Sequence, residues 1–252
     1  RIAAEGVVDI LAQGDSVAMV EVNSETDFVA KNDSFKSFVK GVLETILSEK
    51  PADVDALLAC KFSGTDDTVD AVLKDKTFQI GEKLSIRRFA VVDGLTSTYV
   101  HGGGTIGVIV KAESECADKD AVKAVLKNVA LQIAAMNPKY LDKDSVPAAD
   151  LEAEKEILMA QINNDEKNAS KPEAVKEKMI LGKIGKFYDT NCLLEQEYVK
   201  EDKVKVSAYV ASEANNLGAD IKITSFLRYE KGEGIEKRED NFAEEIAKLT
   251  QK

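Results

Sequence analysis

The chain has 252 residues, and 34 Lys and Arg against 45 Asp and Glu give it a formal net charge of -11 at pH 7. This acidic balance, without any run of basic residues interleaved with aromatics, excludes the usual way of binding nucleic acid through its phosphates. There is no apolar run of about eighteen residues and no signal peptide, so we expect a soluble, cytoplasmic protein that does not enter a membrane.

The cysteines exclude two further classes of protein. Cys60, Cys116 and Cys192 are odd in number and far apart, and His101 is the single histidine of the sequence. A disulfide framework or a structural zinc site is therefore not expected, and we predict neither a metal nor a cofactor. The length is enough for a sizeable core and for two lobes.

The chain opens with a β-hairpin pattern followed by a helix pattern. Residues 7–12 and 16–23 are rich in β-branched residues and flank a Gly-containing turn at 13–15, which predicts two paired strands. Apolar residues then recur at helical spacing until Pro51. These are Phe35, Phe38, Val39, Val42, Leu43, Ile46 and Leu47. We expect this apolar stripe to cover the inner face of the hairpin.

The joint between the second strand and this helix is open to two interpretations. Phe28 or Val29 fits a hydrophobic staple that packs back near Phe35 and fixes the entry to the helix. Alternatively, Asp27 and Phe28 project together from a rigid corner, as an apolar anchor with a charged neighbour for a partner protein. Periodicity does not choose between the two.

Short elements follow in the middle of the chain. Residues 53–58 and 68–74 have the pattern of two short helices, and 84–92 that of a strand. Residues 98–101 and 105–112 flank three consecutive glycines and predict a second hairpin. A phosphate cradle needs a helix behind its glycines, and here a strand follows, so we interpret them as a hairpin loop.

The second half is richer in helices. Residues 118–136 form a clear amphipathic pattern with Asp118 as its cap, and 148–189 contain two charged helices with narrow apolar stripes. Residues 203–210 and 221–230 have strand character. A capping pair and helical spacing predict a last helix over 241–249.

Residues 21–31, which read EVNSETDFVAK, resemble the signature of the bacterial-type elongation factor Ts family. Further similar stretches are 82–92, 99–111 and 226–237. The resemblance implies an α+β fold of two similar lobes with antiparallel sheets and flanking helices, a protruding helical hairpin and a C-terminal helix. The implied domains are an N-terminal lobe (1–140), the helical hairpin (141–190), a C-terminal lobe (191–235) and a C-terminal helix module (236–252). The family's N-terminal helical module is expected before this point and is not in the sequence.

The resemblance also implies a function. Members are guanine nucleotide exchange factors for the GTPase elongation factor Tu. By resemblance, Phe28 and Asp27 insert into the GDP-bound partner and disturb its magnesium and phosphate site, while Thr26 and Val29 hold the corner. Gln132 and Phe242 are implied as further partner contacts, and Gln132 stands where many members have His. Neither nucleic acid nor a membrane is expected as a partner, and pairing into a homodimer stays open.

An enzyme is not predicted. The sequence has no P-loop, nucleophile-elbow or zinc-protease motif, and acidic pairs such as Asp66-Asp67 are better explained by helix starts. The alternative to an exchange factor is a non-exchanging protein-binding module in which Phe28 is a buried helix staple. A metal-dependent enzyme would need clustered ligands. The exposure of the Phe28 side chain separates the first two.

Overall fold

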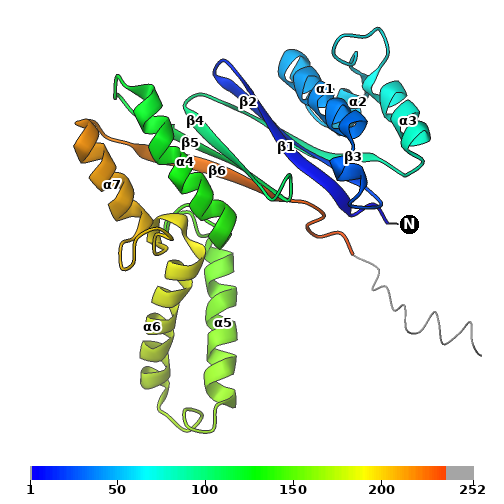
Figure 1. Cartoon of the computed structure of the whole chain (residues 1–252). Helices are drawn as coiled ribbons and strands as arrows, with labels where there is room; N and C mark the ends of the chain where they lie inside the picture. The colour runs from blue at the N-terminus through cyan, green and yellow to red at the C-terminus, as the bar shows by residue number, and fades with distance from the viewer. Residues whose placement is uncertain (1, 237–252) are drawn as a thin grey trace, which may run out of the picture. The chain divides into compact units, whose positions relative to one another are not determined.

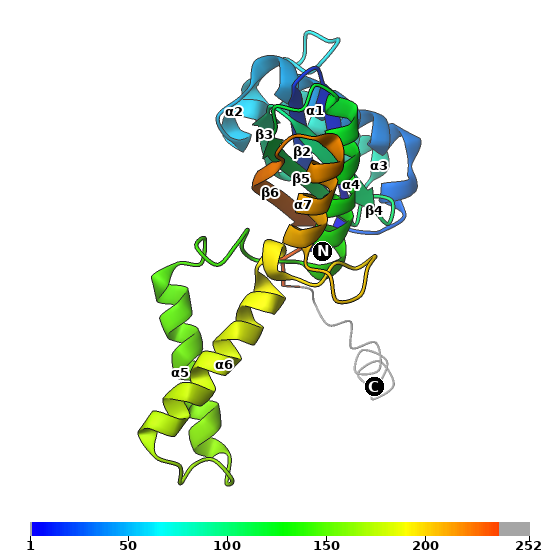
Figure 2. The same cartoon turned by 90° about the vertical axis from the view of Figure 1, so that its left-hand side faces the viewer.

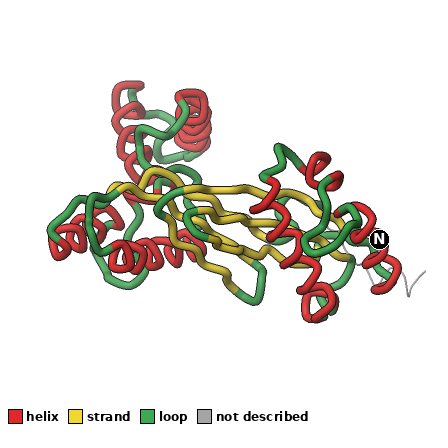
Figure 3. The backbone as a smooth tube through the Cα atoms, turned by 90° about the horizontal axis from the view of Figure 1, so that it is seen from above, coloured by secondary structure: helices red, strands yellow, loops and turns green. Residues whose placement is uncertain are grey.

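The computed structural model describes residues 2–236, which form two compact units that are discontinuous in sequence. Within this range the first unit takes residues 2–91, 100–107 and 229–236, and the second takes 92–99 and 108–228. Helices flank strands in both (Figure 3). The predicted α+β class with antiparallel sheets is confirmed, since the chain forms two three-stranded antiparallel sheets.

The first unit is built on the predicted N-terminal hairpin. Strands β1 (Glu5–Gln13) and β2 (Ser16–Ser24) pair antiparallel from Glu5 and Ser24 to the turn at Gln13 and Ser16. Strand β3 (Ser85–Asp93) joins the other edge of β2, so the order is β1-β2-β3. Because β2 is central, nearly all of its residues are buried, on both faces of the sheet.

Helix α1 (Asp33–Glu49) covers one face of this hairpin, as the sequence predicts (Figure 1). The Asn32 side chain caps it by accepting hydrogen bonds from the N–H groups of Ser34 and Phe35, at 2.8 and 3.2 Å. The shared core combines alternate strand residues with one helix stripe. It includes Val7, Ala18, Val20, Val22, Phe35, Phe38, Val39, Val42, Leu43 and Ile46.

Two more helices complete the first unit. Helix α2 (Val54–Ala59) adds Leu57 to the core, and helix α3 (Val69–Ile80) adds Val69. Helix α3 is longer than the predicted 68–74. It ends at Gly81, whose φ of +77° is the left-handed conformation that glycine adopts without strain.

The second unit contains most of the other sheet and a helical hairpin. Strands β4 (Thr96–His101), β5 (Ile106–Glu113) and β6 (Lys222–Glu230) lie in the order β4-β5-β6. Helix α4 (Lys119–Met136) is capped by Asp118, whose carboxylate accepts the Ala121 N–H at 3.0 Å. The predicted hairpin of α5 (Ala148–Asn164) and α6 (Glu173–Asn191) forms (Figures 1 and 2). Leu158, Ile162, Ile180 and Ile184 are the buried seam between its helices.

The strand predicted over 203–210 is wrong. This segment enters helix α7 (Val206–Leu217), which follows the short 3-10 turn η2 (Leu193–Glu195). Val206, Val210 and Ala214 are buried at a spacing of four residues, so helical burial outweighs the local β-branched alternation. Strand β6, which follows this helix, pairs with β5.

Part of the prediction lies outside the described residues. The helix expected over 241–249, the module 236–252 and Phe242 fall almost wholly in the stretch beyond residue 236. Among residues 2–236, no helix combines the length and apolar character that crossing a bilayer requires.

A buried carboxylate ties three distant segments of the first unit together. Glu21 of β2 has no exposed surface. One of its oxygens accepts a hydrogen bond from the Arg88 Nε at 2.6 Å, and the other accepts from the Gly232 N–H at 2.8 Å and from the Asn23 side chain at 3.0 Å. Arg87 donates to both oxygens, at 3.2 and 3.3 Å. The charge is buried and fully paired.

This network keeps its members charged. Burial alone acts to raise the pKa of Glu21, but hydrogen bonds from Gly232, Asn23 and Arg88, with the charge of Arg88, hold that pKa below its ordinary value. Burial acts to lower the pKa of Arg88, and Glu21 and Glu233 outweigh it, so that pKa is raised. The Arg88 guanidinium also lies 4.1 Å from the centre of the Tyr229 ring.

We expect Glu21→Gln to lower the free energy of unfolding by about 3 kcal/mol at neutral pH, because two partly buried guanidinium groups lose their counter-charge. Since the folded-state pKa of Glu21 is depressed, its contribution is present above the ordinary value of 4.5 and is lost as the pH falls through the lower folded value. Urea unfolding at about pH 7 and about pH 3.5 measures both effects.

The matched control is Glu113→Gln, which changes an exposed glutamate at the end of β5. It should leave stability nearly unchanged. Equal losses for the two variants, or a Glu21→Gln deficit that does not shrink in acid, would contradict the stabilising role of the network.

Candidate functional site

The corner motif, residues 24–32, leads from β2 into α1. The Ser24 hydroxyl donates to the Thr26 carbonyl at 2.8 Å, and a single 3-10 turn, η1 (Val29–Lys31), follows. The Lys31 N–H donates to the Phe28 carbonyl at 3.1 Å and closes this turn. Asn32 then caps α1. Hydrogen bonds therefore fix the path of the chain at the end of β2, in the 3-10 turn and at the start of α1.

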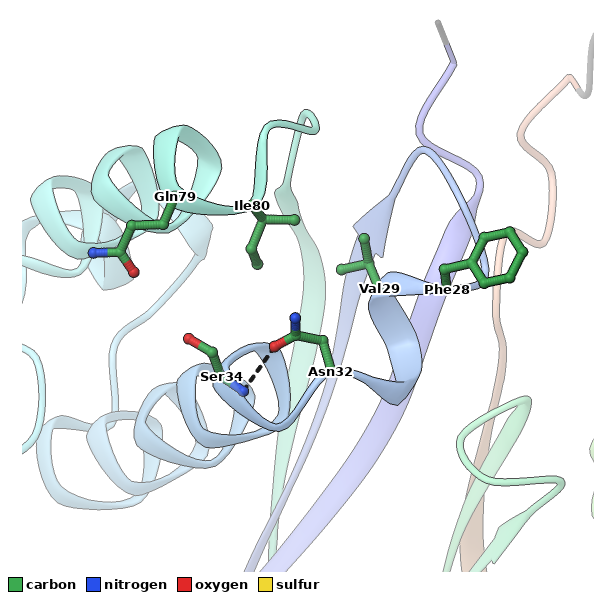
Figure 4. A pocket seen from close by; sticks show the side chains of 6 residues that line it. All are labelled: Phe28, Val29, Asn32, Ser34, Gln79 and Ile80. Atoms are coloured by element: carbon green, nitrogen blue, oxygen red, sulfur yellow. Dashed lines mark hydrogen bonds between the residues drawn. The ribbon is translucent and has the colours of Figure 1, made fainter.

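Two neighbouring side chains of the corner motif differ in exposure, since one is buried in the core and the other is exposed to solvent. Val29 is 6% exposed and belongs to the core that contains Phe35, whereas Phe28 is 77% exposed. Figure 4 shows the Phe28 ring pointing away from Val29, Ile80 and Gln79. The interpretation of Phe28 as a buried staple is therefore wrong, and Val29 fills that place in the core.

Asp27 shares the exposed side with Phe28. Its side chain is exposed, and within residues 2–236 it makes no hydrogen bond or ion pair. Thr26, which precedes it, is partly buried, and its N–H and hydroxyl both donate to the carboxylate of Glu82. Of the four predicted site residues, the outer two are anchored and the middle two are presented to solvent.

An open depression lies beside the corner motif, between the starts of η1 and α1 and the end of α3 (Figure 4). It is lined by Phe28, Val29, Asn32, Ser34, Gln79 and Ile80. Its lining combines the polar Asn32, Ser34 and Gln79 with three apolar side chains. Such a surface is suited to contact with another protein rather than to enclosing a small molecule.

Gln132 is placed differently from the prediction. It is fully buried in the second unit, where its amide nitrogen donates to the Gln196 side chain at 3.2 Å and to the Glu197 carbonyl at 3.0 Å. Its amide oxygen accepts the Val199 N–H at 2.8 Å. This burial counts against a direct partner contact by Gln132 and indicates that it holds the 196–199 segment in place.

The described residues bear on two kinds of chemical site, a metal-binding group and a nucleophilic thiol. Within residues 2–236 there is no group of three or more His, Cys, Asp and Glu side chains arranged to hold a metal ion. Cys192 is buried, and burial raises the pKa of its thiol to about 11. A thiol in that state is a poor nucleophile at neutral pH.

Comparison with known proteins adds the family. A model of the family described as elongation factor TS matches residues 25–233, which begins inside the corner motif. The chain belongs to the elongation factor Ts family. The predicted resemblance is thereby confirmed.

Several curated members of the elongation factor Ts family are similar over nearly the whole chain. The elongation factor Ts of Syntrophotalea carbinolica is 43% identical over 253 residues, which cover 99% of this chain and 82% of that protein. Those of Clostridium kluyveri and Clostridioides difficile are 44% and 45% identical, each over 98% of this chain and 81% of the relative.

The burial pattern of the corner motif predicts that two neighbouring substitutions differ in their effect on stability. Val29→Ala should lower the free energy of unfolding by about 2 kcal/mol, because it removes buried methyl groups from a packed core. Phe28→Ala should change it by less than about 0.5 kcal/mol, since the ring is in water. Chemical denaturation of both variants tests this, and a loss for Phe28→Ala as large as that for Val29→Ala would contradict the assignment.

Proposed function

We propose that this chain is a guanine nucleotide exchange factor that binds elongation factor Tu in its GDP state and promotes GDP release during translation elongation, in the cytoplasm. Membership of the elongation factor Ts family supports this proposal. The observation that carries its mechanism is the 77% exposure of Phe28 on a corner whose flanking residues are anchored.

An exposed Phe on a rigid corner is a source of binding energy. Transferring such a ring from water into an apolar pocket contributes about 2–3 kcal/mol. Little of this is lost to ordering, because the backbone on both sides is already fixed. Asp27 next to the ring adds an uncompensated carboxylate, which orients the corner against polar or basic groups of the partner.

To promote exchange, this binding energy must be larger for the nucleotide-free partner than for the GDP-bound partner. A factor that binds the nucleotide-free partner more tightly than the GDP-bound partner weakens GDP binding to the same extent, because the two ligands are thermodynamically linked. In the proposed mechanism Phe28 enters between two helices of the partner's GTPase domain, and Asp27 engages polar groups beside it. The resulting shift disturbs the magnesium and phosphate site, and GDP leaves without any covalent step.

Phe28→Ala should lower the rate of GDP release from elongation factor Tu at saturating factor by about 30- to 100-fold, which corresponds to the loss of one buried aromatic ring. Stopped-flow release of a fluorescent GDP analogue measures this rate. The matched control is Phe78→Ala, which removes an aromatic ring that is 89% exposed on α3 of the same unit.

Phe78→Ala should exchange like the parent. If Phe28→Ala also matches the parent, the insertion mechanism is wrong, and the chain is a binding module whose contacts lie elsewhere. If both variants slow GDP release equally, the effect comes from removing exposed apolar surface in general and not from a specific role of Phe28.

Asp27→Ala should slow release by about 5- to 10-fold, the effect of removing one charge-assisted hydrogen bond to the partner. Stability should be unchanged, because the Asp27 side chain has no partner within residues 2–236. Asp55→Ala, at an exposed position of α2, controls for the change in net charge. A drop in the thermal midpoint without slower exchange would show that Asp27 is structural.

A further inference from the structure

The corner motif is held from outside by the segment that follows α3. After Gly81 ends that helix, the side chain of Glu82 reaches the corner motif. One of its carboxylate oxygens accepts the Thr26 N–H at 3.0 Å, and the other accepts the Thr26 hydroxyl at 2.6 Å. The two contacts join residues that are 56 positions apart in the sequence.

A second contact runs in the reverse direction. The carboxylate of Glu25 accepts the Lys83 N–H at 3.1 Å, so residues 25–26 and 82–83 form three hydrogen bonds with one another. We call this set the clasp. Each bond has an ionised acceptor, the stronger kind of protein hydrogen bond. The next residue, Leu84, is buried in the core and fixes the far side of the clasp.

We propose that Glu82 is a positioning residue for exchange, which fixes the direction of Asp27 and Phe28 through Thr26; this inference rests on the proposed function. Among residues 2–236, neither exposed side chain makes a hydrogen bond, ion pair or ring contact that would orient it. Their direction is set by the backbone between two anchors, the Glu82 clasp at Thr26 and the buried Val29. Without the first anchor the corner samples more conformations, and binding has to order it at an entropic cost.

The residue type at position 82 suits this task. Thr26 offers two donors, its N–H and its hydroxyl, and a carboxylate accepts both with its two oxygens. A glutamine at position 82 has only one acceptor oxygen, and its NH₂ group is a donor. If the NH₂ group faces the Thr26 N–H, two donors meet; if it faces the Thr26 hydroxyl, the hydroxyl must rotate to accept. Glu82→Gln should therefore retain part of the positioning of Thr26, and Glu82→Ala none of it.

Mobility of the corner motif tests the clasp in the absence of any partner. In ¹⁵N relaxation measurements on the full chain, the order parameters of the Asp27 and Phe28 amides should fall from about 0.85 in the parent to below about 0.6 in Glu82→Ala, with Glu82→Gln between them. Asp75→Ala is the matched control, since it removes an exposed acidic side chain from α3, the helix that ends just before Glu82. Unchanged order parameters in Glu82→Ala overturn the proposal.

GDP release from elongation factor Tu tests the consequence. Glu82→Ala should lower the maximal rate about 10-fold, Glu82→Gln less, and Asp75→Ala not at all. A slower rate with an unchanged corner overturns the positioning role, and so does a parent-like rate with a mobile corner. If the parent itself fails to accelerate release, the proposed function is wrong, while the relaxation data still decide whether Glu82 fixes the corner.

Discussion

The buried charge of Glu21 is the constraint on which the first unit depends. A carboxylate with no exposed surface is stable only when its oxygens are paired, and its donors come from β2, β3 and the turn after β6. Three of the stretches that resemble the family, 21–31, 82–92 and 226–237, meet at this point. The network fixes the path of β2, and the corner motif begins where that strand ends.

Adjacent residues of the corner motif have different tasks, since some anchor the backbone and others expose their side chains to solvent. Val29 packs in the core, Thr26 is held by Glu82, and Asn32 caps α1, so the backbone is determined on both sides. Asp27 and Phe28 lie between these anchors, and their side chains make no hydrogen bond or ion pair with the rest of the described chain. In the proposed mechanism, substitutions at the anchors should therefore act on stability and corner geometry, whereas substitutions at the exposed pair should act on binding to the partner. This separation makes the proposed mechanism testable residue by residue.

Local patterns predicted most of the elements, and long-range contacts account for the rest. The hairpin of β1 and β2, the cap of α1 and the pair α5 and α6 follow from turn chemistry, capping and helical spacing, all of which are local. The alternation of Val204 and Val206 with lysines predicts a strand over 203–210, whereas burial follows the helical spacing from Val206 to Val210. The spacing of apolar residues is compatible with either a buried or an exposed Phe28. It also does not indicate the contact of Glu82 with Thr26, because the two residues are 56 positions apart in the sequence.

An experimental structure of this chain bound to nucleotide-free elongation factor Tu would test the proposed insertion most directly. In that complex the Phe28 ring, 77% exposed in the free chain, should be buried between helices of the GTPase domain, with Asp27 within hydrogen-bond distance of a partner group. A complex in which the Phe28 ring stays in water, while the α5 and α6 hairpin or another surface makes the contact, would contradict the proposed insertion.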